Sequence, residues 1–230
     1  MKTLGLLGGM TWHSTVDYYR LINAGVQERL GGSHSADLLL LSIDFEPVEQ
    51  MQERGDWAGM GRLMGEWAGR LEGAGAEGLV ICANTMHRLV DDIVRVIRIP
   101  VIHIADATAA AVRQAGLDTI ALLGTRYTME LDFYRGRLEK AHGLKVLVPD
   151  EAGRTAVHNI IYRELTYGTV KDESRRSYVE IIRGLVGRGA QGVILGCTEI
   201  PLLIKEKDSP VPVFDTTALH ARAAVDFALS

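Results

Sequence analysis

Short apolar runs alternate along this chain with longer segments in which apolar residues recur at helical spacing. A continuous apolar run is typical of a strand covered on both faces of a parallel sheet, and a longer periodic segment is typical of an amphipathic helix. The apolar runs predict strands at residues 3–7, 37–43, 78–82, 101–104, 119–123, 144–148 and 211–215, and one more that ends at Gly196.

Helices are predicted between these runs, at about residues 14–30, 56–74, 86–95, 105–115, 127–141, 153–167, 172–188 and 216–228, with one more beginning near Pro201. Strand and helix therefore alternate along the whole chain. This order is typical of the α/β class with mostly parallel sheets.

Two stretches of the chain are near copies of each other. Gly75-Ala-Glu-Gly-Leu-Val-Ile-Cys-Ala-Asn-Thr85 and Gly189-Ala-Gln-Gly-Val-Ile-Leu-Gly-Cys-Thr-Glu199 align on Gly-Ala-x-Gly, which pairs Ala83 with Cys197. A second match relates Thr3-Leu-Gly-Leu-Leu-Gly-Gly9 to Thr119-Ile-Ala-Leu-Leu-Gly-Thr125. These matches predict two homologous halves.

We expect each half to be a doubly wound, flavodoxin-like parallel-sheet domain. The two domains are expected to be related by pseudo-twofold symmetry, with the active site between them. The N-terminal half is predicted to span residues 1–98 plus 211–230, because the last strand and helix are expected to cross back to it. The C-terminal half is predicted to span residues 99–210.

Four predicted strand ends carry small or polar residues: Gly8-Gly9-Met10, Ala83-Asn84-Thr85, Gly124-Thr125 and Cys197-Thr198-Glu199. Ligands bind at the carboxyl ends of parallel strands, and the N–H groups of a following helix attract anions such as a carboxylate. A thiol at such a helix start is expected to have a lowered pKa and to act as base, acid or nucleophile. The alternative for Cys197 is a buried structural thiol, since free cysteine is among the most buried residue types.

The composition argues against several other classes of protein. A net charge of -4 gives no basic footprint for nucleic acid. No apolar run approaches the roughly 18 residues of a membrane span. The two cysteines are not spaced as a metal site or a CxxC pair, and free thiols suit a reducing compartment, so we expect a cytoplasmic protein.

Three further motifs carry a resemblance to a known family: Gly5-Leu-Leu-Gly-Gly-Met-Thr-Trp-His-Ser-Thr15, Asn84-Thr-Met-His87 and Leu123-Gly-Thr-Arg-Tyr-Thr-Met-Glu130. With the Gly-Cys-Thr-Glu end, their order and spacing resemble the aspartate/glutamate racemase family, and within it the broad-specificity amino-acid racemase subgroup. The resemblance covers the whole chain. It implies an enzyme that uses no pyridoxal phosphate or other cofactor, takes a small amino acid as substrate and forms a homodimer.

The resemblance also implies a two-base mechanism, in which residues on opposite faces of the substrate Cα exchange the α-proton. Both are usually cysteines. The second maps onto Cys197, whereas the first maps onto Ala83, which carries no exchangeable proton. Cys82 lies one residue early, and a one-residue step in a strand turns a side chain to the opposite face. We therefore expect Cys82 to be a core thiol, with catalysis through a bulge at the strand end as the alternative.

The resemblance places a further set of residues around the substrate: Met10, Gln52, Ala83, Asn84, Thr85, Thr198 and Glu199. Asn84, Thr85 and Thr198 are expected to contact its carboxylate and ammonium groups. Met10 and Gln52 match pocket positions, with core filler and solvated surface as their alternatives, and Glu199 either binds the ammonium or favours a helix start. His87 is interpreted as a helix-packing histidine rather than a catalyst, and His103 as a core residue.

Three functions follow from these observations. The first is a racemase or epimerase of small amino acids, of the aspartate, glutamate or homoserine class, with Cys197 as principal base. Opposite it, a bound water or a nearby side chain replaces the base missing at Ala83, or the enzyme is stereochemically one-sided. The second is a single-thiol decarboxylase or isomerase of small dicarboxylates, since a one-thiol relative in the family decarboxylates arylmalonates. The third is a catalytically silent amino-acid binding protein.

Overall fold

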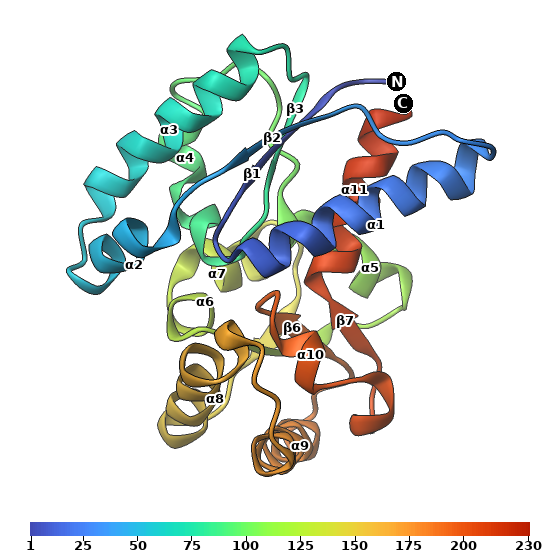
Figure 1. Ribbon diagram of the computed structural model, residues 1–230. Helices are drawn as coiled ribbons and strands as arrows, with labels where there is room; N and C mark the ends of the chain where they lie inside the picture. The colour runs from blue at the N-terminus through green and yellow to red at the C-terminus, as the bar shows by residue number, and fades with distance from the viewer. The chain divides into compact units, whose positions relative to one another are not determined.

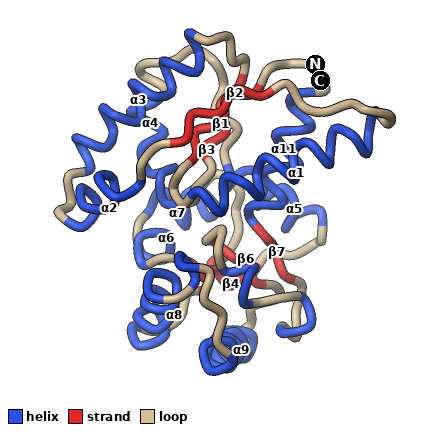
Figure 2. The backbone as a smooth tube through the Cα atoms, viewed as in Figure 1, coloured by secondary structure: helices blue, strands red, loops and turns tan.

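A computed structural model describes residues 1–230, and the chain divides into two compact units. Unit 1 comprises Met1–His103 and His220–Ser230, and unit 2 comprises Ile104–Leu219. Each unit is built on its own parallel sheet, as the alternation of strands and helices predicts (Figures 1 and 2).

The sheet of unit 1 contains β1 (Leu4–Gly8), β2 (Leu38–Ser42) and β3 (Gly78–Ile81) in the order β2-β1-β3, all parallel. The predicted strand at 101–104 is reduced to one parallel bridge between Val101 and Leu79, because a helix already begins at Ile104. The sequence predicts β2 to be covered on both faces, but β2 is an edge strand and its Leu40 is 48% exposed.

The helical segments of unit 1 are α1 (Trp12–Leu30), α2 (Phe45–Glu53), α3 (Trp57–Gly73), η1 (Thr85–Leu89), α4 (Val90–Ile93) and the larger part of α11 (Thr216–Ala228). The predicted helix at 86–95 is thus a 3-10 turn followed by a short α-helix. Two apolar clusters cover the two faces of the sheet. One joins α1 and α11 to it through Tyr18, Ile22 and Val225, and the other includes Met64 of α3. Figure 1 shows α3 on one side of these strands and α1 with α11 on the other.

The sheet of unit 2 repeats this order with one more full strand. It contains β4 (Thr119–Gly124), β5 (Lys145–Leu147), β6 (Val193–Gly196) and β7 (Val213–Asp215) in the order β5-β4-β6-β7, all parallel. The strands β5, β4 and β6 correspond to β2, β1 and β3, and β7 corresponds to the bridge at Val101. The internal repeat of the sequence is therefore a repeat of topology.

The helical segments of unit 2 are α5 (Ile104–Gln114), α6 (Arg126–Glu130), α7 (Asp132–Lys140), α8 (Glu151–Arg163), η2 (Leu165–Tyr167), α9 (Asp172–Gly187), α10 (Ile200–Leu203) and η3 (Glu206–Asp208). The predicted helix at 127–141 is divided in two, because Leu131 has an extended backbone conformation. One apolar cluster packs α8 and α9 on the sheet, and another includes α5 and α7.

The unit boundaries differ from those that the sequence predicts. Residues 211–219 stay with unit 2 because β7 pairs with β6, with Ile194 beside Phe214. The chain returns to unit 1 at His220, inside α11, rather than at residue 211. The first crossing falls after His103 rather than at residue 99.

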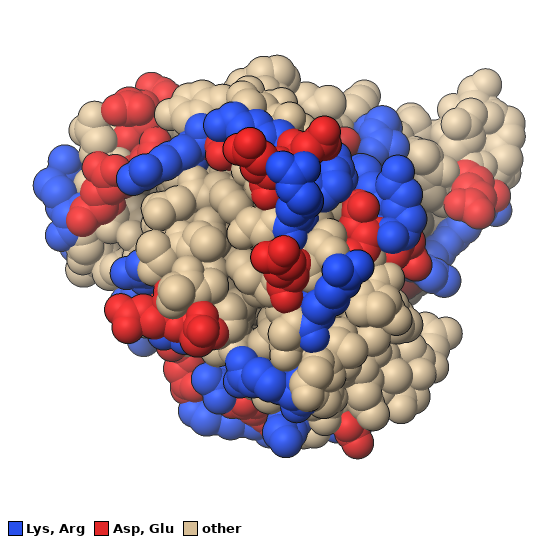
Figure 3. Space-filling model, turned by 90° about the horizontal axis from the view of Figure 1, so that it is seen from below, with Lys and Arg blue, Asp and Glu red and all other residues tan.

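No helix in the structure has both the length and the apolar character that spanning a membrane requires. On the face drawn in Figure 3, acidic and basic side chains are interspersed among uncharged ones rather than sorted by sign. This distribution agrees with the small net charge of the chain.

Candidate active site

The carboxyl end of β6 brings three predicted residues together around one carboxylate. Cys197 follows the strand directly, and its Sγ donates a hydrogen bond of 2.9 Å to Glu199 Oε2. The Thr198 hydroxyl donates to the same oxygen at 2.8 Å. Cys197 and Glu199 are both buried, so these contacts are shielded from water.

The surroundings of Cys197 favour the neutral thiol. Burial, followed by the negative charge and hydrogen bond of Glu199, raises the pKa of Cys197 well above its usual range. The backbone N–H groups of Glu199 and Thr198 act in the opposite direction, but their effect is smaller. The following helix α10 has only 4 residues. The prediction of a lowered thiol pKa is therefore wrong, and Cys197 rests as a proton donor.

Tyr178 is a neighbour of this group that sequence reasoning misses. It lies on α9, is completely buried and donates from its hydroxyl to the Val157 carbonyl at 3.3 Å. Burial raises its pKa well above the usual range, with smaller effects from Cys197, Glu164 and Glu199. No motif marks this tyrosine, because its proximity to the thiol depends on how α9 packs on the sheet.

The end of β3 separates Cys82 and Ala83 onto opposite faces of the sheet. Cys82 is completely buried in the cluster that contains Tyr18 and Ile22 of α1, and burial raises the pKa of its thiol. Ala83 instead lies in the opposite cluster, with Met10. These contacts favour the core role for Cys82 that the one-residue step predicts.

The remaining predicted residues of unit 1 are buried around the same strand ends. Asn84 and Thr85 follow Ala83 directly and begin the turn η1. Gln52 lies on α2 and is only 4% exposed, so it is not solvated surface. Val48, one helical turn before Gln52, packs in the cluster that contains Ala83.

The end of β1 depends on two glycines and on Thr15, the last residue of the first motif. Gly9 has a φ of 94°, a conformation that glycine adopts without strain, and its N–H donates to Thr15 Oγ1 at 2.8 Å. A Cβ at Gly8 would lie 2.5 Å from the Thr15 methyl carbon. Thr15 and the two glycines therefore fix this strand end together.

The end of β4 is closed by a helix cap. Thr125 precedes α6, and its hydroxyl accepts a hydrogen bond of 3.3 Å from the Thr128 N–H. The next N–H, that of Arg126, donates to His158 Nδ1 at 3.3 Å. The predicted Gly124-Thr125 end thus carries a capping hydroxyl, in the role that threonine commonly has before a helix.

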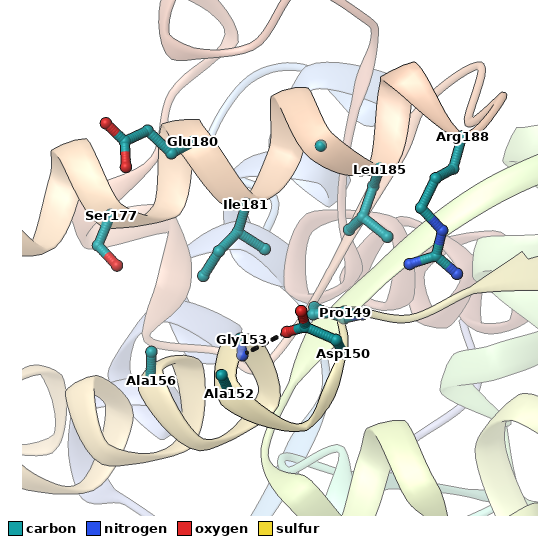
Figure 4. A pocket seen from close by; sticks show the side chains of 11 residues that line it. Pro149, Asp150, Ala152, Gly153, Ala156, Ser177, Glu180, Ile181, Leu185 and Arg188 are labelled. Atoms are coloured by element: carbon teal, nitrogen blue, oxygen red, sulfur yellow. Dashed lines mark hydrogen bonds between the residues drawn. The ribbon is translucent and has the colours of Figure 1, made fainter.

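A pocket of about 460 Å³ lies between α8 and α9 of unit 2, and none of the residues predicted for the site lines it (Figure 4). Small residues such as Ala152 and Ala156 leave space below Ile181 and Leu185. Asp150 at its edge caps α8 by accepting from the Gly153 N–H at 2.8 Å. The pocket is therefore best explained as a packing gap between two helices.

Comparisons with known proteins identify the family and agree with the fold. A family profile described as Asp/Glu/Hydantoin racemase matches residues 7–224. A candidate Asp/Glu racemase from Yersinia pestis is 53% identical, with a TM-score of 0.95 and coverage of 100% of both chains. An aspartate racemase homologue from Pyrococcus horikoshii OT3 is 36% identical, with a TM-score of 0.86 and the same 100% coverage. The broad specificity amino-acid racemase RacX of Bacillus subtilis (strain 168) is 22% identical over 227 residues, 96% of each chain.

The fold, the strand ends and these matches together define an enzyme of the isomerase class, a racemase. The chain belongs to the Asp/Glu/Hydantoin racemase family. The match confirms the family resemblance that the sequence motifs carry.

Proposed function

We propose that the protein is a cofactor-independent racemase or epimerase of small amino acids, and that Cys197 exchanges the α-proton of the substrate. The observation that carries the proposal is the hydrogen bond of 2.9 Å between the Cys197 thiol and the Glu199 carboxylate. A thiol acts as a base only after it has lost its proton, and Glu199 is in place to accept it.

In this mechanism the thiol proton passes to Glu199, and the resulting thiolate takes the proton from Cα. The electron pair of the broken C–H bond stays on Cα until a proton returns. Asn84, Thr85 and Thr198, with Met10 and Gln52 lining the pocket, are proposed to bind the amino acid. Glu199 is then a proton acceptor for the thiol rather than a partner of the substrate ammonium.

The second proton carrier is the open part of the mechanism. Ala83 has no exchangeable proton, and Cys82 points to the opposite face of its sheet, so we assign the second transfer to neither residue. With Cys197 alone, Cα exchanges its proton on one face. Inversion then requires a bound water or another side chain. Exchange is therefore expected to be faster than inversion.

The substrate class is proposed from the names of the relatives, which include an aspartate racemase homologue and a broad specificity amino-acid racemase. The test is to incubate the protein in D2O with the L- and D-forms of aspartate, glutamate and homoserine. Loss of the α-proton is followed by NMR, and inversion by chiral chromatography. Cys197→Ala is expected to abolish exchange, whereas the matched control Cys82→Ala retains it. Unchanged exchange in Cys197→Ala would exclude the mechanism.

The same assays address the missing base directly. If the second carrier is what limits inversion, Ala83→Cys places a thiol at the matched strand end and raises the inversion rate relative to exchange. An unchanged ratio would mean that another group already supplies the second proton.

A second candidate is the decarboxylation of small substituted malonates, and the neutral state of Cys197 favours it. Such a reaction needs a single proton donor, and here a buried thiol is protonated while Ala83 carries no thiol. Release of CO2 from a substituted malonate that disappears in Cys197→Ala, without exchange in any amino acid, would favour this reaction. Binding without either reaction would favour a silent binding protein.

We also propose a cytoplasmic homodimer, as the resemblance implies. Both cysteines are unpaired thiols, which agrees with a reducing compartment. Light scattering of the purified protein measures the mass in solution, and a mass of one chain at assay concentration would exclude the dimer.

A further inference from the structure

Three buried histidines of unit 1, His87, His103 and His220, form a cluster next to the residues that follow β3. The ring centre of His87 is 4.7 Å from that of His103 and 5.4 Å from that of His220. Tyr18 of α1 contacts His220, with 2.7 Å between the hydroxyl oxygen and Nδ1. The cluster therefore joins η1, α1, α11 and the segment that precedes α5.

The hydrogen bonds fix which ring nitrogens carry protons. A backbone carbonyl can only accept, so His220 Nε2 donates to the Ile102 carbonyl at 2.6 Å. In the neutral ring Nδ1 must then accept the hydrogen bond from the Tyr18 hydroxyl. By the same argument, His87 Nδ1 donates to the Ala83 carbonyl at 2.8 Å.

The rings of His87 and His220 are held neutral. Burial, followed by the neighbouring His103 and His220, lowers the pKa of His87 well below its usual range. Burial also lowers the pKa of His220 to about 4. At neutral pH the rings of His87 and His220 are therefore neutral donors and acceptors with defined directions.

His87 contacts Ala83 just beyond the last residue of β3 that is hydrogen-bonded to the sheet. The Cys82 N–H donates to the Leu7 carbonyl at 2.9 Å, and the paired register ends at Ile81. Beyond this point, His87 makes two hydrogen bonds to the backbone that follows β3. Its ring donates to the Ala83 carbonyl, and its backbone N–H donates to the Asn84 carbonyl at 3.1 Å.

We propose that His87 is a positioning residue for the racemase, which holds the Ala83 peptide and thereby orients Asn84 and Thr85 toward the substrate. This role rests on the proposed function and goes beyond helix packing. A packing residue requires only volume, whereas this site requires a donor at the Nδ1 position. Without that donor, a buried carbonyl next to the substrate-binding residues loses its partner.

Two amide variants separate the two roles. His87→Asn places an amide N–H close to the position of Nδ1, whereas His87→Gln places it near Nε2. We expect His87→Asn to retain kcat for α-proton exchange, and His87→Gln to lose about 10- to 100-fold in kcat through misplacement of the substrate contacts. Urea unfolding followed by tryptophan fluorescence reports on unit 1, because Trp12, Trp57 and Trp67 all lie there. Equal activity of the two variants, or losses that follow unfolding alone, would overturn the proposal.

Two readouts do not depend on substrate. Amide hydrogen exchange in the segment 83–89 is expected to be faster in His87→Gln than in wild type and His87→Asn, and equal rates would exclude the positioning role. Nitrogen NMR of the wild-type protein is expected to show the Nδ1–H tautomer of His87, and the Nε2–H tautomer would overturn the geometry. If the wild type shows no α-proton exchange with any amino acid, the proposed function fails, whereas these readouts still decide what His87 does.

Discussion

Unit 1 is expected to lose stability in mild acid, because His220 is buried as a neutral ring. His220 is completely buried, donates to the Ile102 carbonyl and accepts from the Tyr18 hydroxyl, so its neutral form fits its surroundings. Protonating His220 would place a charge inside the core and disrupt the hydrogen bond from Tyr18.

The size of the effect follows from the two pKa values of His220. Burial lowers its pKa in the folded protein to about 4, from an ordinary value of 6.5. Between these values the unfolded chain binds the proton and the folded chain does not, so the free energy of unfolding falls as the pH falls. At 1.36 kcal/mol per pKa unit, the full loss is roughly 3 kcal/mol below pH 4, and roughly 2 kcal/mol of it is lost by pH 4.5. His87 adds to the loss in the same direction, because its pKa is also lowered.

The assay is urea unfolding at pH 7.0 and pH 4.5, followed by tryptophan fluorescence, because all three tryptophans lie in unit 1. His220→Gln removes the titrating ring. Its free energy of unfolding is expected to change less between the two pH values than that of wild type, by roughly 2 kcal/mol. His34→Gln, at an exposed histidine, is the matched control and is expected to behave as wild type.

The comparison between variants removes the contribution of the carboxylates, which wild type and both variants share. If His220→Gln loses as much stability in acid as wild type does, His220 does not titrate with a lowered pKa. The reasoning about the neutral cluster would then be refuted.

Three further substitutions test the site and its supports. Glu199→Gln removes the negative charge that, together with burial, raises the pKa of Cys197. The pKa of the thiol is therefore expected to fall, and alkylation of Cys197 by iodoacetamide at fixed pH is expected to become faster. Slower alkylation would contradict the electrostatic argument. Gly8→Ala places a Cβ 2.5 Å from the Thr15 methyl carbon. It is expected to lower the free energy of unfolding in urea by about 1–3 kcal/mol, and no change would mean that the strand end relaxes at little cost. Gly184→Ala lies in the interior of α9, with nothing within 4 Å of the added Cβ. It is expected to raise the free energy of unfolding by about 0.5–1 kcal/mol. A lower free energy of unfolding would show a contact absent from the structure.

The sequence alone predicts the parallel α/β class and the positions of most strand ends, but it assigns β7 to the wrong unit. Apolar runs mark strands, and the repeat around Gly78 and Gly192 predicts that the two sheets share an order, which the structure confirms. The alternation of side chains along a strand also predicts that Cys82 and Ala83 face opposite ways, since this depends only on local geometry. Boundaries are less accurate, as at residues 86–95, because a 3-10 turn and an α-helix have similar patterns.

Only the tertiary structure decided the chemical state of the site. Whether Cys197 is a thiol or a thiolate depends on burial and on the carboxylate of Glu199, and the burial depends on how helices such as α9, with Tyr178, pack on the sheet. The same holds for His87 and His220, which are far apart along the chain and become neighbours only when α11 packs on unit 1. The spacing and periodicity of residues predict which helices and strands form. The desolvation and the electrostatic environment of a side chain depend instead on every segment that packs around it.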